Sequence, residues 1–459
     1  MKKIKLAYIG GGSKAWARVF MNDLALTGDL SGEIALYDID VPAAERNKKI
    51  GERINECEAA VSRWDYTVCE NIDDALRGAD FVACSILPGT FDEMAADVHL
   101  PEQYGIYQSV GDTVGPGGVL RAMRTVPIYE FFAGKIRDIC PDAWVINLTN
   151  PMYICTKTLY DVFPDVKAFG CCHEVFGTED FLCDVAKEML GIPRPNRREI
   201  YVDASGINHF TWITEARLGE VDLLALLPEF TAKYFETGYP ADISGSPFKG
   251  GNKVKMDLYR RFGVLGAAGD RHLVEFMNGA WYIKDEEDVE KWKYHLTSVD
   301  YRKNDMREKI ESSEKIASGE EPPVLKKSSE ELISMMRSLL GLDRIVTNAN
   351  VINRGQMPDL PSSCIVETNC EFSSNSLKPI LARRLPPAVL NLVLRNAMNF
   401  ETTYYGIKER DLDVIFEAFV NQPLCSSLPL CEARELFGKM ISATRNYLED
   451  HYDISEYIK

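Results

Sequence analysis

The fold is decided by the segment Ile4–Ala15, which reads IKLAYIGGGSKA. Its first part, Ile4–Ile9, is a short apolar run typical of a buried strand, and apolar residues recur at helical spacing over Ala15–Leu26. The three glycines between them predict a tight loop that joins this strand to the helix. In such a loop Gly10 permits a sharp turn, and Gly12 lets the backbone approach the pyrophosphate of a dinucleotide.

An acidic residue completes this predicted cofactor site. Glu33–Tyr37 is a second strand candidate, and Asp38 follows it at the spacing where a carboxylate bonds the ribose hydroxyls. This placement favours NAD over NADP. A flavodoxin-like fold that binds another nucleotide is the alternative, because glycine-rich turns after strands are common. The residues predicted to bind NAD are Gly10, Gly11, Gly12, Ser13, Asp38, Ser85 and Asn150.

Strand and helix candidates alternate along the first part of the chain. After a helix that Pro42 opens, further strand candidates lie at Tyr66–Cys69, Asp80–Leu87 and Trp144–Leu148. This alternation predicts an α/β fold with a doubly wound, parallel sheet of the Rossmann type.

A cluster of turn residues at Gly191–Asn196 (GIPRPN) predicts the boundary between two domains. We place an NAD-binding Rossmann-type domain at residues 1–195. Residues 196–459 are expected to form an α+β domain that binds substrate and metal and makes the oligomer contacts. A plan of this kind is that of lactate and malate dehydrogenases.

Within the second domain, Glu199–Leu218 is predicted to be rich in strands and Asn252–Phe262 to be helical. Residues 302–340 have the pattern of charged helices, broken at residues 319–323 (GEEPP). We expect this last stretch to be a solvated segment at the surface.

Composition excludes several classes of partner. The chain has 459 residues and a formal net charge of -17, which argues against nucleic acid and acidic membranes as partners. An anionic ligand must therefore be met by a local cluster of cations. The sequence has neither a run of 18 apolar residues nor the apolar core of a signal peptide. It predicts a cytoplasmic protein whose twelve cysteines are thiols.

Residue types that can bind metal or sugar occur in two distant segments. Cys172 and His173 follow a short apolar strand, and His209 lies among the first strands of the second domain. A thiolate from Cys172 and an imidazole from His209 can ligate a divalent cation and leave positions open for substrate oxygens. Ordinary core packing is the alternative. Asn150, at the carboxyl edge of the sheet, can bond a sugar hydroxyl or a nicotinamide, unless it only forms an Asn-Pro turn.

These motifs together resemble glycoside hydrolase family 4, the NAD-dependent glycosidases. The resemblance spans nearly the whole chain and rests on IGGGS at 9–13, GDTVGPGGVLRAMRTVP at 111–127, NLTNP at 147–151, CCHEV at 171–175, GINHF at 206–210 and VINRGQMPDLPSSCIVE at 351–367. It implies a redox route to hydrolysis. NAD removes hydride from C3 of the sugar, a base removes the acidified C2 proton, the C1 group is eliminated, water adds and the hydride returns. A divalent metal, usually manganese, polarises the C2 and C3 oxygens.

The resemblance also implies roles for particular residues. Cys172 and His209 correspond to the metal ligands, and Asn150 to a sugar-binding asparagine. His173 follows the metal cysteine, where related members carry the acid that helps the leaving group depart, so it is expected to contact substrate. Asp112, in the GDTVG segment, is a further implied sugar contact.

The base that removes the C2 proton is left open between Asp257 and Tyr259. Phospho-glycosidase members use a tyrosine from a helix that corresponds to Lys253–Phe262. We favour Asp257, because a carboxylate is already ionised at pH 7, whereas Tyr259 needs a pKa lowered by several units. A charged helix face without a catalytic role is the alternative for both.

The four residues that begin at the metal cysteine track substrate class within the family, and here they read CHEV. Phospho-glycosidases carry Asp or Asn in the second place, whereas CHEV resembles the α-galacturonidases. That resemblance implies a C6 carboxylate in the pocket. Its predicted partners are Arg260 and Arg261, which lie close in sequence to Arg271 and His272. Solvated arginines at a helix end are the alternative.

The predicted activity is hydrolysis of α-glycosides of a uronic acid, with NAD, Mn²⁺ and reducing conditions. An α-glucosidase, α-galactosidase or α-glucuronidase that uses the same route comes next. A 2-hydroxy acid dehydrogenase would share the cofactor domain, but it does not explain the extra length or the pair Cys172 and His209. A catalytically inert NAD-binding protein would tolerate replacement of Cys172 or Asp257. The resemblance further implies a homodimer or homotetramer that acts on a small carbohydrate.

Overall fold

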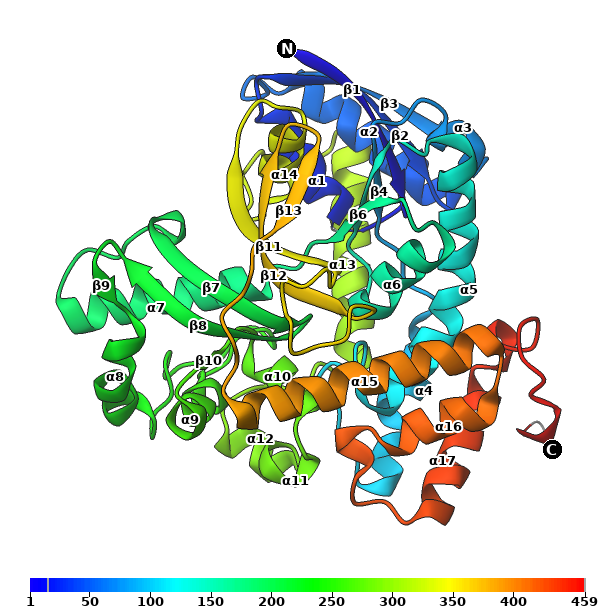
Figure 1. Ribbon diagram of the computed structural model, residues 1–459. Helices are drawn as coiled ribbons and strands as arrows, with labels where there is room; N and C mark the ends of the chain where they lie inside the picture. The colour runs from blue at the N-terminus through cyan, green and yellow to red at the C-terminus, as the bar shows by residue number, and fades with distance from the viewer. Residues whose placement is uncertain (15, 458–459) are drawn as a thin grey trace.

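Six parallel strands form the part of the sheet that the sequence analysis predicts. The computed structural model describes residues 1–14 and 16–457, so Ala15, the predicted start of the first helix, lies outside the described residues. The strand order is β3-β2-β1-β4-β5-β6, which is the order of the Rossmann fold (Figure 1). The strands are β1 (Lys2–Ile9), β2 (Leu30–Tyr37), β3 (Trp64–Cys69), β4 (Phe81–Cys84), β5 (Trp144–Asn147) and β6 (Lys167–Gly170).

Helices cover both faces of this parallel part. One apolar cluster packs α1 and α2 against one face, and a second packs α3, α5 and α6 against the other. The prediction of a doubly wound α/β fold is therefore confirmed. The helices of this part are α1 (Trp16–Ala25), α2 (Val41–Glu56), α3 (Ile72–Leu76), α4 (Phe91–His99), η1 (Pro101–Tyr104), α5 (Gly115–Ile139), α6 (Met152–Val162) and α7 (Glu174–Leu190).

The sheet does not end at β6, because antiparallel strands from the second half of the chain extend it. Asn350 of β11 pairs with Gly170 of β6, and the order continues β11-β12-β7-β8-β10. The predicted boundary between residues 195 and 196 falls between α7 and η2, and it stays a prediction. The added strands are β7 (Ile200–Ile207), β8 (Phe210–Leu218), β9 (Val221–Asp222), β10 (Leu265–Gly266), β11 (Ile345–Ile352), β12 (Ile365–Ser373) and β13 (Ser376–Pro379).

The helices of the second half lie in two regions. Figure 1 shows α15, α16 and α17 together at the end of the molecule that α4 and α5 reach, while α8 and α9 lie beside β8. Together with the antiparallel strands, they form the predicted α+β part. These helices are η2 (Arg197–Glu199), η3 (Leu224–Leu226), α8 (Leu227–Tyr234), α9 (Lys253–Phe262), α10 (Asp270–Leu273), η4 (Val274–Phe276), α11 (Gly279–Tyr282), α12 (Glu286–Lys291), α13 (Val299–Ser318), α14 (Leu332–Leu339), α15 (Pro387–Glu409), α16 (Leu412–Val420), η5 (Pro423–Cys425), α17 (Leu430–Ala443), η6 (Arg445–Tyr447) and η7 (Ser455–Tyr457).

The segment expected to be a solvated excursion, residues 302–340, is instead part of the framework. Helix α13 lies against α2 and α4, which belong to the parallel half. In α14 the side chains of Met335 and Met336 are fully buried against the same face of the sheet as α1. The prediction was wrong because the charged residues of α13 lie on its outer face only. In addition, the apolar stretch of α14 is short and is flanked in the sequence by charged residues, so it does not stand out.

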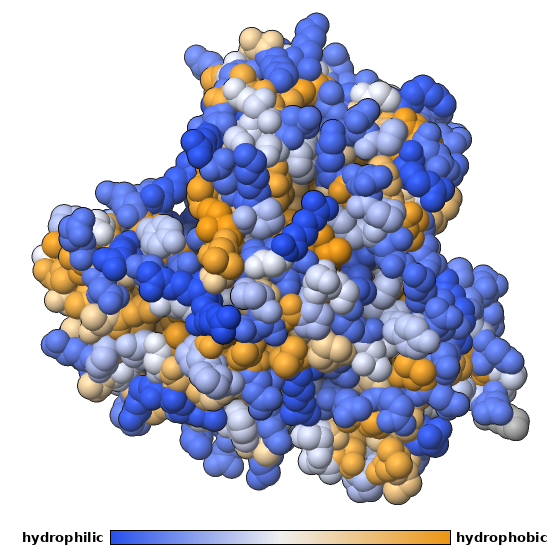
Figure 2. Space-filling view, in the orientation of Figure 1, coloured by the Kyte–Doolittle hydropathy of each residue, from blue (hydrophilic) through white to orange (hydrophobic). Residues whose placement is uncertain are grey.

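The visible surface is mixed in polarity. Figure 2 shows hydrophilic residues over most of this face, with hydrophobic residues gathered in small patches. The surface is hollowed between the part that carries β11 and the part that carries β7. Within the described ranges, the search for a helix that is long and apolar enough to cross a membrane finds none.

This architecture brings distant loops to one edge of the sheet. The carboxyl ends of β1, β4, β5 and β6 point the same way, since these strands are parallel. Strand β12 pairs with β7 at Glu367 and Gly206, which places the turn between β7 and β8 beside that edge. Ligands bind at this edge in open α/β sheets. The predicted site residues after β1, β4, β5, β6 and β7 therefore come from five separate loops.

Candidate functional site

The glycine loop is held close to its neighbours in a way that only glycine permits. Gly10 has a φ of 92°, and a Cβ on it would lie 1.9 Å from the carbonyl oxygen of Ser85. The backbone N–H of Gly12 donates to Oδ2 of Asp38 at 2.7 Å. A Cβ on Gly12 would meet that same oxygen at 2.8 Å. Gly10, Gly12, Asp38 and Ser85 thus lie together, as the cofactor prediction expects.

A residue that the sequence analysis missed fastens the same loop. The Asn47 side chain on α2 donates to the carbonyl oxygens of Gly11 and Ser13 at 2.7 and 2.8 Å. Ser13 Oγ accepts the N–H of Trp16 at 3.1 Å and so caps the start of α1. With its carbonyls engaged, the loop is held open for a phosphate group at the helix N-terminus. The signal in the sequence that could have indicated this role is an asparagine inside the helix that Pro42 opens.

Asn150 has an unused acceptor in the same region. Its carbonyl oxygen accepts Nε of Arg121 at 3.0 Å, whereas its side-chain Oδ1 is buried without a hydrogen-bond partner among the described residues. An unpaired buried polar atom is costly, so such an atom marks the place of a missing donor. A nicotinamide amide or a sugar hydroxyl would supply one.

Cys172 and His209, the predicted metal ligands, come to the same place. His209 has a φ of 62° in the two-residue turn between β7 and β8. The neighbouring Asn208 side chain approaches the Cys172 thiol, while both of its polar atoms are buried without a hydrogen-bond partner among residues 1–14 and 16–457. His209 Nδ1 lies 3.1 Å from Thr113 Oγ1. The described residues contain no cluster of three or more His, Cys, Asp or Glu arranged for a metal.

The protonation of this pair fits a metal site with two protein ligands. Burial lowers the pKa of His209 to about 3, helped by His272, so its imidazole is neutral as metal binding requires. Burial, Glu367 and Glu174 raise the pKa of Cys172 well above that of a free thiol. A cation is what would stabilise the buried thiolate. Two ligands leave coordination positions open for substrate oxygens.

Glu174, known from the sequence only as the third letter of CHEV, links this pair to the second half of the chain. Its Oε1 lies 3.3 Å from Nε2 of His272, and its Oε2 accepts the N–H of Gly269 at 2.7 Å. The His272 ring lies against that of His209, with centroids 4.0 Å apart. Burial opposes ionisation, but His272 and His173 hold the pKa of Glu174 well below its usual value.

His173, the predicted acid, is half-exposed at the rim of this group. Its Nε2 lies 3.7 Å from Oε1 of Glu174, and its Nδ1 lies 3.8 Å from Oε1 of Glu330. The Trp16 ring is 5.7 Å away from the His173 ring, centroid to centroid. A solvent-accessible imidazole between two carboxylates is suited to proton transfer at a leaving group.

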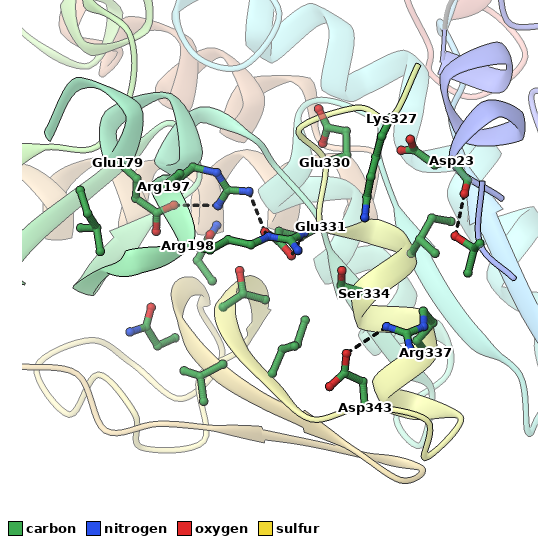
Figure 3. Close-up of a pocket in the computed structure, with 18 of the residues that line it drawn as sticks. Asp23, Glu179, Arg197, Arg198, Lys327, Glu330, Glu331, Ser334, Arg337 and Asp343 are labelled. Carbon is green, nitrogen blue, oxygen red and sulfur yellow. Dashed lines mark hydrogen bonds and ion pairs between the residues drawn. The ribbon is translucent and has the colours of Figure 1, made fainter. Parts of the chain in front are cut away.

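A groove of about 800 Å³ begins beyond Glu330. Figure 3 shows its charged lining, in which Arg197 points to Glu179 and Glu331, and Arg337 points to Asp343. These ion pairs satisfy the arginines within the groove. These arginines are therefore not left without a counter-charge in the groove.

Arg121 and Arg302 lie beside Asp112, and Arg271 lies beside Arg302, without such ion pairs. Burial opposes ionisation of Asp112, yet Arg121 and Arg302 lower its pKa to about 2. Burial lowers the pKa of Arg302, Asp112 raises it, and Arg271 and Arg121 lower it further. Among the described residues, no carboxylate oxygen lies within 4.0 Å of a guanidinium nitrogen of these three arginines. The Nε atom of Arg302 is buried and has no hydrogen-bond partner in the part of the chain that the structure describes.

Backbone contacts hold this cationic cluster in place. Arg302 Nη2, from α13, donates to the carbonyl of Val110 at 3.3 Å, and Arg271 Nη1 donates to Thr297 Oγ1 at 3.0 Å. Glu275 accepts the N–H groups of Val110 and Gly111 at 2.7 and 2.9 Å. Because burial raises the pKa of Glu275 to about 7, this carboxyl cancels only part of the positive charge.

The structure does not bring Arg260 and Arg261, the arginines predicted to bind the substrate carboxylate, to the site. Both are exposed on the outer side of α9. The Arg260 guanidinium lies over the Phe235 ring, and Arg261 donates to the Tyr282 hydroxyl at 2.6 Å. Arg271 and His272 do reach the site, since the His272 ring lies against that of His209 and Arg271 lies beside Arg302. The four residues are close in sequence, but the fold separates Arg260 and Arg261 from Arg271 and His272.

Nor does the structure bring Asp257 and Tyr259 to the site as bases. Asp257 Oδ2 accepts the Tyr282 hydroxyl at 2.7 Å and lies 3.7 Å from Nη1 of Arg261. The Tyr259 hydroxyl donates to the carbonyl of Leu224 at 2.8 Å, and burial raises its pKa. Both side chains are thus engaged by partners outside the group formed by Glu174, His209 and His272. The pattern of residues 253–262 predicts a helix, but the faces that this helix turns to its neighbours depend on tertiary contacts.

Comparison with known proteins gives this site a family. The description "Family 4 glycosyl hydrolase" matches residues 5–188, and "Family 4 glycosyl hydrolase C-terminal domain" matches residues 204–425. A protein from Thermoanaerobacterium saccharolyticum named α-galacturonidase is 49% identical over 450 residues, 97% of each chain.

Solved structures agree with this match. The crystal structure of lplD from Bacillus subtilis has a TM-score of 0.91 at 45% identity, and the alignment covers 96% of this chain and 100% of that one. The fold is shared with a Thermotoga maritima 6-phospho-β-glucosidase solved with manganese, NAD⁺ and glucose-6-phosphate, at a TM-score of 0.77 and 19% identity over 97% and 99% of the chains. With a strand–glycine loop–helix unit, a Cys172 and His209 pair at the sheet edge and sequence matches over both halves, the chain belongs to glycosyl hydrolase family 4.

Proposed function

We propose that the protein is an α-galacturonidase, which hydrolyses α-glycosides of galacturonic acid. The observation that carries this proposal is the surplus of positive charge around Asp112, where Arg121, Arg271 and Arg302 have no carboxylate within 4.0 Å among the described residues. Holding buried arginines together is costly, because they are desolvated and repel one another, unless a further anionic group joins them. The C6 carboxylate of a uronide is such a group, and a guanidinium binds it through two parallel hydrogen bonds.

The name of the relative at 49% identity supports the same substrate. The alternatives with a neutral sugar would leave the arginine cluster without a ligand. An α-glucuronidase would use the same cluster and differs only in the configuration at C4. Membership of the glycosyl hydrolase family removes the 2-hydroxy acid dehydrogenase as an alternative.

The residues present fit the two cofactors of the proposed activity. Gly10, Gly12 and Asp38 would hold NAD, and Cys172 and His209 would hold a divalent metal, Mn²⁺ in the first instance. The unpaired buried Oδ1 of Asn150 and the two unpaired polar atoms of Asn208 fit a site that is completed by ligands. When bound, the dinucleotide would exchange a hydride with C3 of the sugar, and the metal would polarise the C2 and C3 oxygens.

The side chains of this chain have separate tasks in the proposed reaction. Arg121 and Arg302 bind the C6 carboxylate and so fix the sugar ring, while Asn150 and Asp112 bond its hydroxyls. His173 gives a proton to the glycosidic oxygen as the C1–O bond breaks. Its partial exposure at the rim leaves room for the leaving group and for the water that later adds.

The proposed setting is the cytoplasm, under reducing conditions. Each of the twelve cysteines is free in the structure, and eleven of them are at least partly buried. A reducing compartment keeps the Cys172 thiol available for metal. A homodimer or homotetramer stays a prediction, which sedimentation of the purified protein would test.

The decisive assay is release of nitrophenol from nitrophenyl α-galacturonide, with and without NAD, Mn²⁺ and a thiol reductant. We expect turnover only when all three are present, and slower turnover of the α-galactoside and α-glucoside, which lack the C6 carboxylate. Turnover without NAD would refute the redox route. Turnover of the neutral glycosides but not the galacturonide would refute the proposed sugar.

A further inference from the structure

We propose that Lys255 is the base that accepts the C2 proton of the bound sugar. This inference rests on the proposed function, because it assigns a residue to a step of that reaction. Lys255 lies on α9, the helix that carries Asp257 and Tyr259, on a face turned away from that of Asp257. The sequence analysis did not consider it.

The position of Lys255 places its amine directly behind the CHEV segment. The side chain is only 2% exposed, and its Nζ donates to Oγ1 of Thr178 at 2.9 Å. Thr178 belongs to the first turns of α7, the helix that begins at Glu174. The amine is therefore bonded to a residue that lies one helical turn after Glu174.

The amine has no full counter-charge. Two carboxylates face it, Asp270 from α10 and Glu174 from α7, and neither lies within 4.0 Å of Nζ. The Asp270 oxygens are engaged by the N–H groups of Val254 and Lys255 at 3.1 and 3.0 Å. Those of Glu174 are engaged by Gly269 and His272, as described above. Both carboxylates are thus held by other partners, and Lys255 is left with a single hydroxyl as its hydrogen-bond acceptor among residues 1–14 and 16–457.

The surroundings favour a neutral amine with a free electron pair. Burial lowers the pKa of Lys255 to about 8, although Asp270 and Glu174 oppose this effect. The Phe181 ring, 5.2 Å from Nζ, covers its outer side. A buried lysine without a salt bridge is the form in which this residue acts as a general base. Perturbed groups of this kind gather at functional sites.

Helical geometry separates Lys255 from Asp257, and hydrogen bonding separates it from Tyr259. Residues two apart on an α-helix point about 200° apart, so the face that turns Lys255 toward Thr178 turns Asp257 away, where it is bonded to Tyr282. Tyr259 lies one turn after Lys255 on the same side of the helix, but its hydroxyl is bonded to the carbonyl of Leu224, and burial raises its pKa. Lys255 is the titratable side chain of α9 that faces the Glu174 carboxylate.

The proposed step balances as follows. With the C3 hydride held by a bound dinucleotide, C3 would be a ketone and the C2 proton would be acidic. The C2–H bond breaks and its proton passes to the electron pair of Lys255 Nζ, which becomes an ammonium. The electrons of that bond form the C1–C2 double bond while the C1–O bond breaks, and the leaving oxygen takes a proton from His173. The same ammonium can return a proton to C2 after water has added.

The test compares four proteins: wild type, Lys255→Met, Lys255→Arg and the control Lys253→Met. Lys253 lies on the same helix and is 9% exposed, but its Nζ bonds the carbonyl of Glu236 at 3.3 Å. The substrate is the nitrophenyl α-glycoside that the wild type cleaves, with hydrogen or deuterium at C2. We expect both Lys255 variants to lose about 10²- to 10⁴-fold in kcat, with NAD affinity unchanged, and the control to stay within about threefold of wild type.

Two further measurements separate a base from a structural or charged residue. Added methylamine should restore turnover of Lys255→Met, and the restored reaction should show a primary isotope effect from deuterium at C2. The wild-type rate should rise with pH up to about 8, since the amine must be neutral. Activity retained by Lys255→Arg would overturn the proposal, because arginine keeps the charge but cannot act as a base. Failure of the wild type on the galacturonide alone would refute the proposed sugar and leave the assignment of Lys255 standing.

Discussion

Nε2 of His272 lies 3.3 Å from Oε1 of Glu174, inside the site and shielded from water. The contact joins α10 to the start of α7, two residues after Cys172. The His272 ring also lies against the His209 ring, 4.0 Å between centroids. Glu174 thus holds His272 against the predicted metal ligand His209, in the way that outer carboxylates commonly orient a metal site.

Glu174→Gln should weaken metal binding by about 10- to 100-fold, because the amide loses the charge that holds His272 and hence His209. Titration of Mn²⁺ by electron paramagnetic resonance measures this directly. Glu330→Gln is the matched control, since Glu330 approaches His173 but not His272. Equal affinities for the two variants would contradict the role assigned to Glu174.

Arg302→Met should lower kcat/KM for the nitrophenyl α-galacturonide by about 10²-fold or more, since a charge-assisted bond to the C6 carboxylate is lost. The neutral α-galactoside should be affected much less. The ratio of the two kcat/KM values is the measurement. Arg260→Met, which removes an exposed guanidinium over Phe235, should leave that ratio unchanged. If both variants change it equally, the cationic cluster does not select the sugar.

Gly10→Ala should abolish NAD binding. A Cβ at this position would lie 1.9 Å from the Ser85 carbonyl oxygen, and the φ of 92° is strained for any other residue. The measurement is the rise in melting temperature on addition of NAD, which should vanish in the variant. Gly134→Ala is the control, because that glycine lies inside α5 with nothing within 4 Å of the added Cβ. It should keep the NAD response and gain up to about 1 kcal/mol of stability.

Glu367→Gln should change how stability depends on pH. Burial raises the pKa of Glu367 to about 7, against hydrogen bonds from Thr211, Asn348 and Asn350. The folded chain therefore holds this proton more tightly than the unfolded chain between pH 4.5 and pH 7. Stability from this group is present below pH 4.5, is lost as pH rises to 7, and stays lost above. The glutamine of the variant does not titrate, so this part of the pH dependence should be absent.

The free energy of unfolding of Glu367→Gln, measured by denaturant at pH 5 and pH 8, should therefore fall less with pH than that of the wild type. From pH 5 to pH 8, the free energy of unfolding of the variant should rise relative to that of the wild type by up to about 3 kcal/mol. Metal-free protein is used, so that only protonation changes. Parallel pH dependences would show that Glu367 is already ionised in the folded protein.

Much of the cofactor region could be predicted because its determinants are local. The strand Lys2–Ile9, the positive φ of Gly10 and the placement of Asp38 after β2 follow from short-range patterns. Asn47 escaped notice because its role is to bond loop carbonyls from a different element. Similarly, α14 was predicted to lie at the surface, because its few apolar residues can be recognised as buried only from their packing on the face of the sheet that α1 also covers.

The substrate side of the site was predicted less well, for the same reason. Arg260 and Arg271 look alike in the sequence, yet one lies over Phe235 at the surface and the other beside Arg302 in the site. Arg302 is 190 residues from Asp112 and meets it only because α13 packs across the parallel half. Lys255 and Asp257 share a helix whose orientation depends on its tertiary contacts.

By itself, the sequence determined the strand–glycine loop–helix unit, the residue types of the metal pair and the likeness to a family. Backbone conformation and hydrogen bonding act between near neighbours, so they can be recognised from a short segment. Only the tertiary structure decided which cations lack a counter-charge and which face of α9 meets the site. Burial, charge pairing and the pKa values that follow from them depend on packing between distant segments, and no local pattern contains that information.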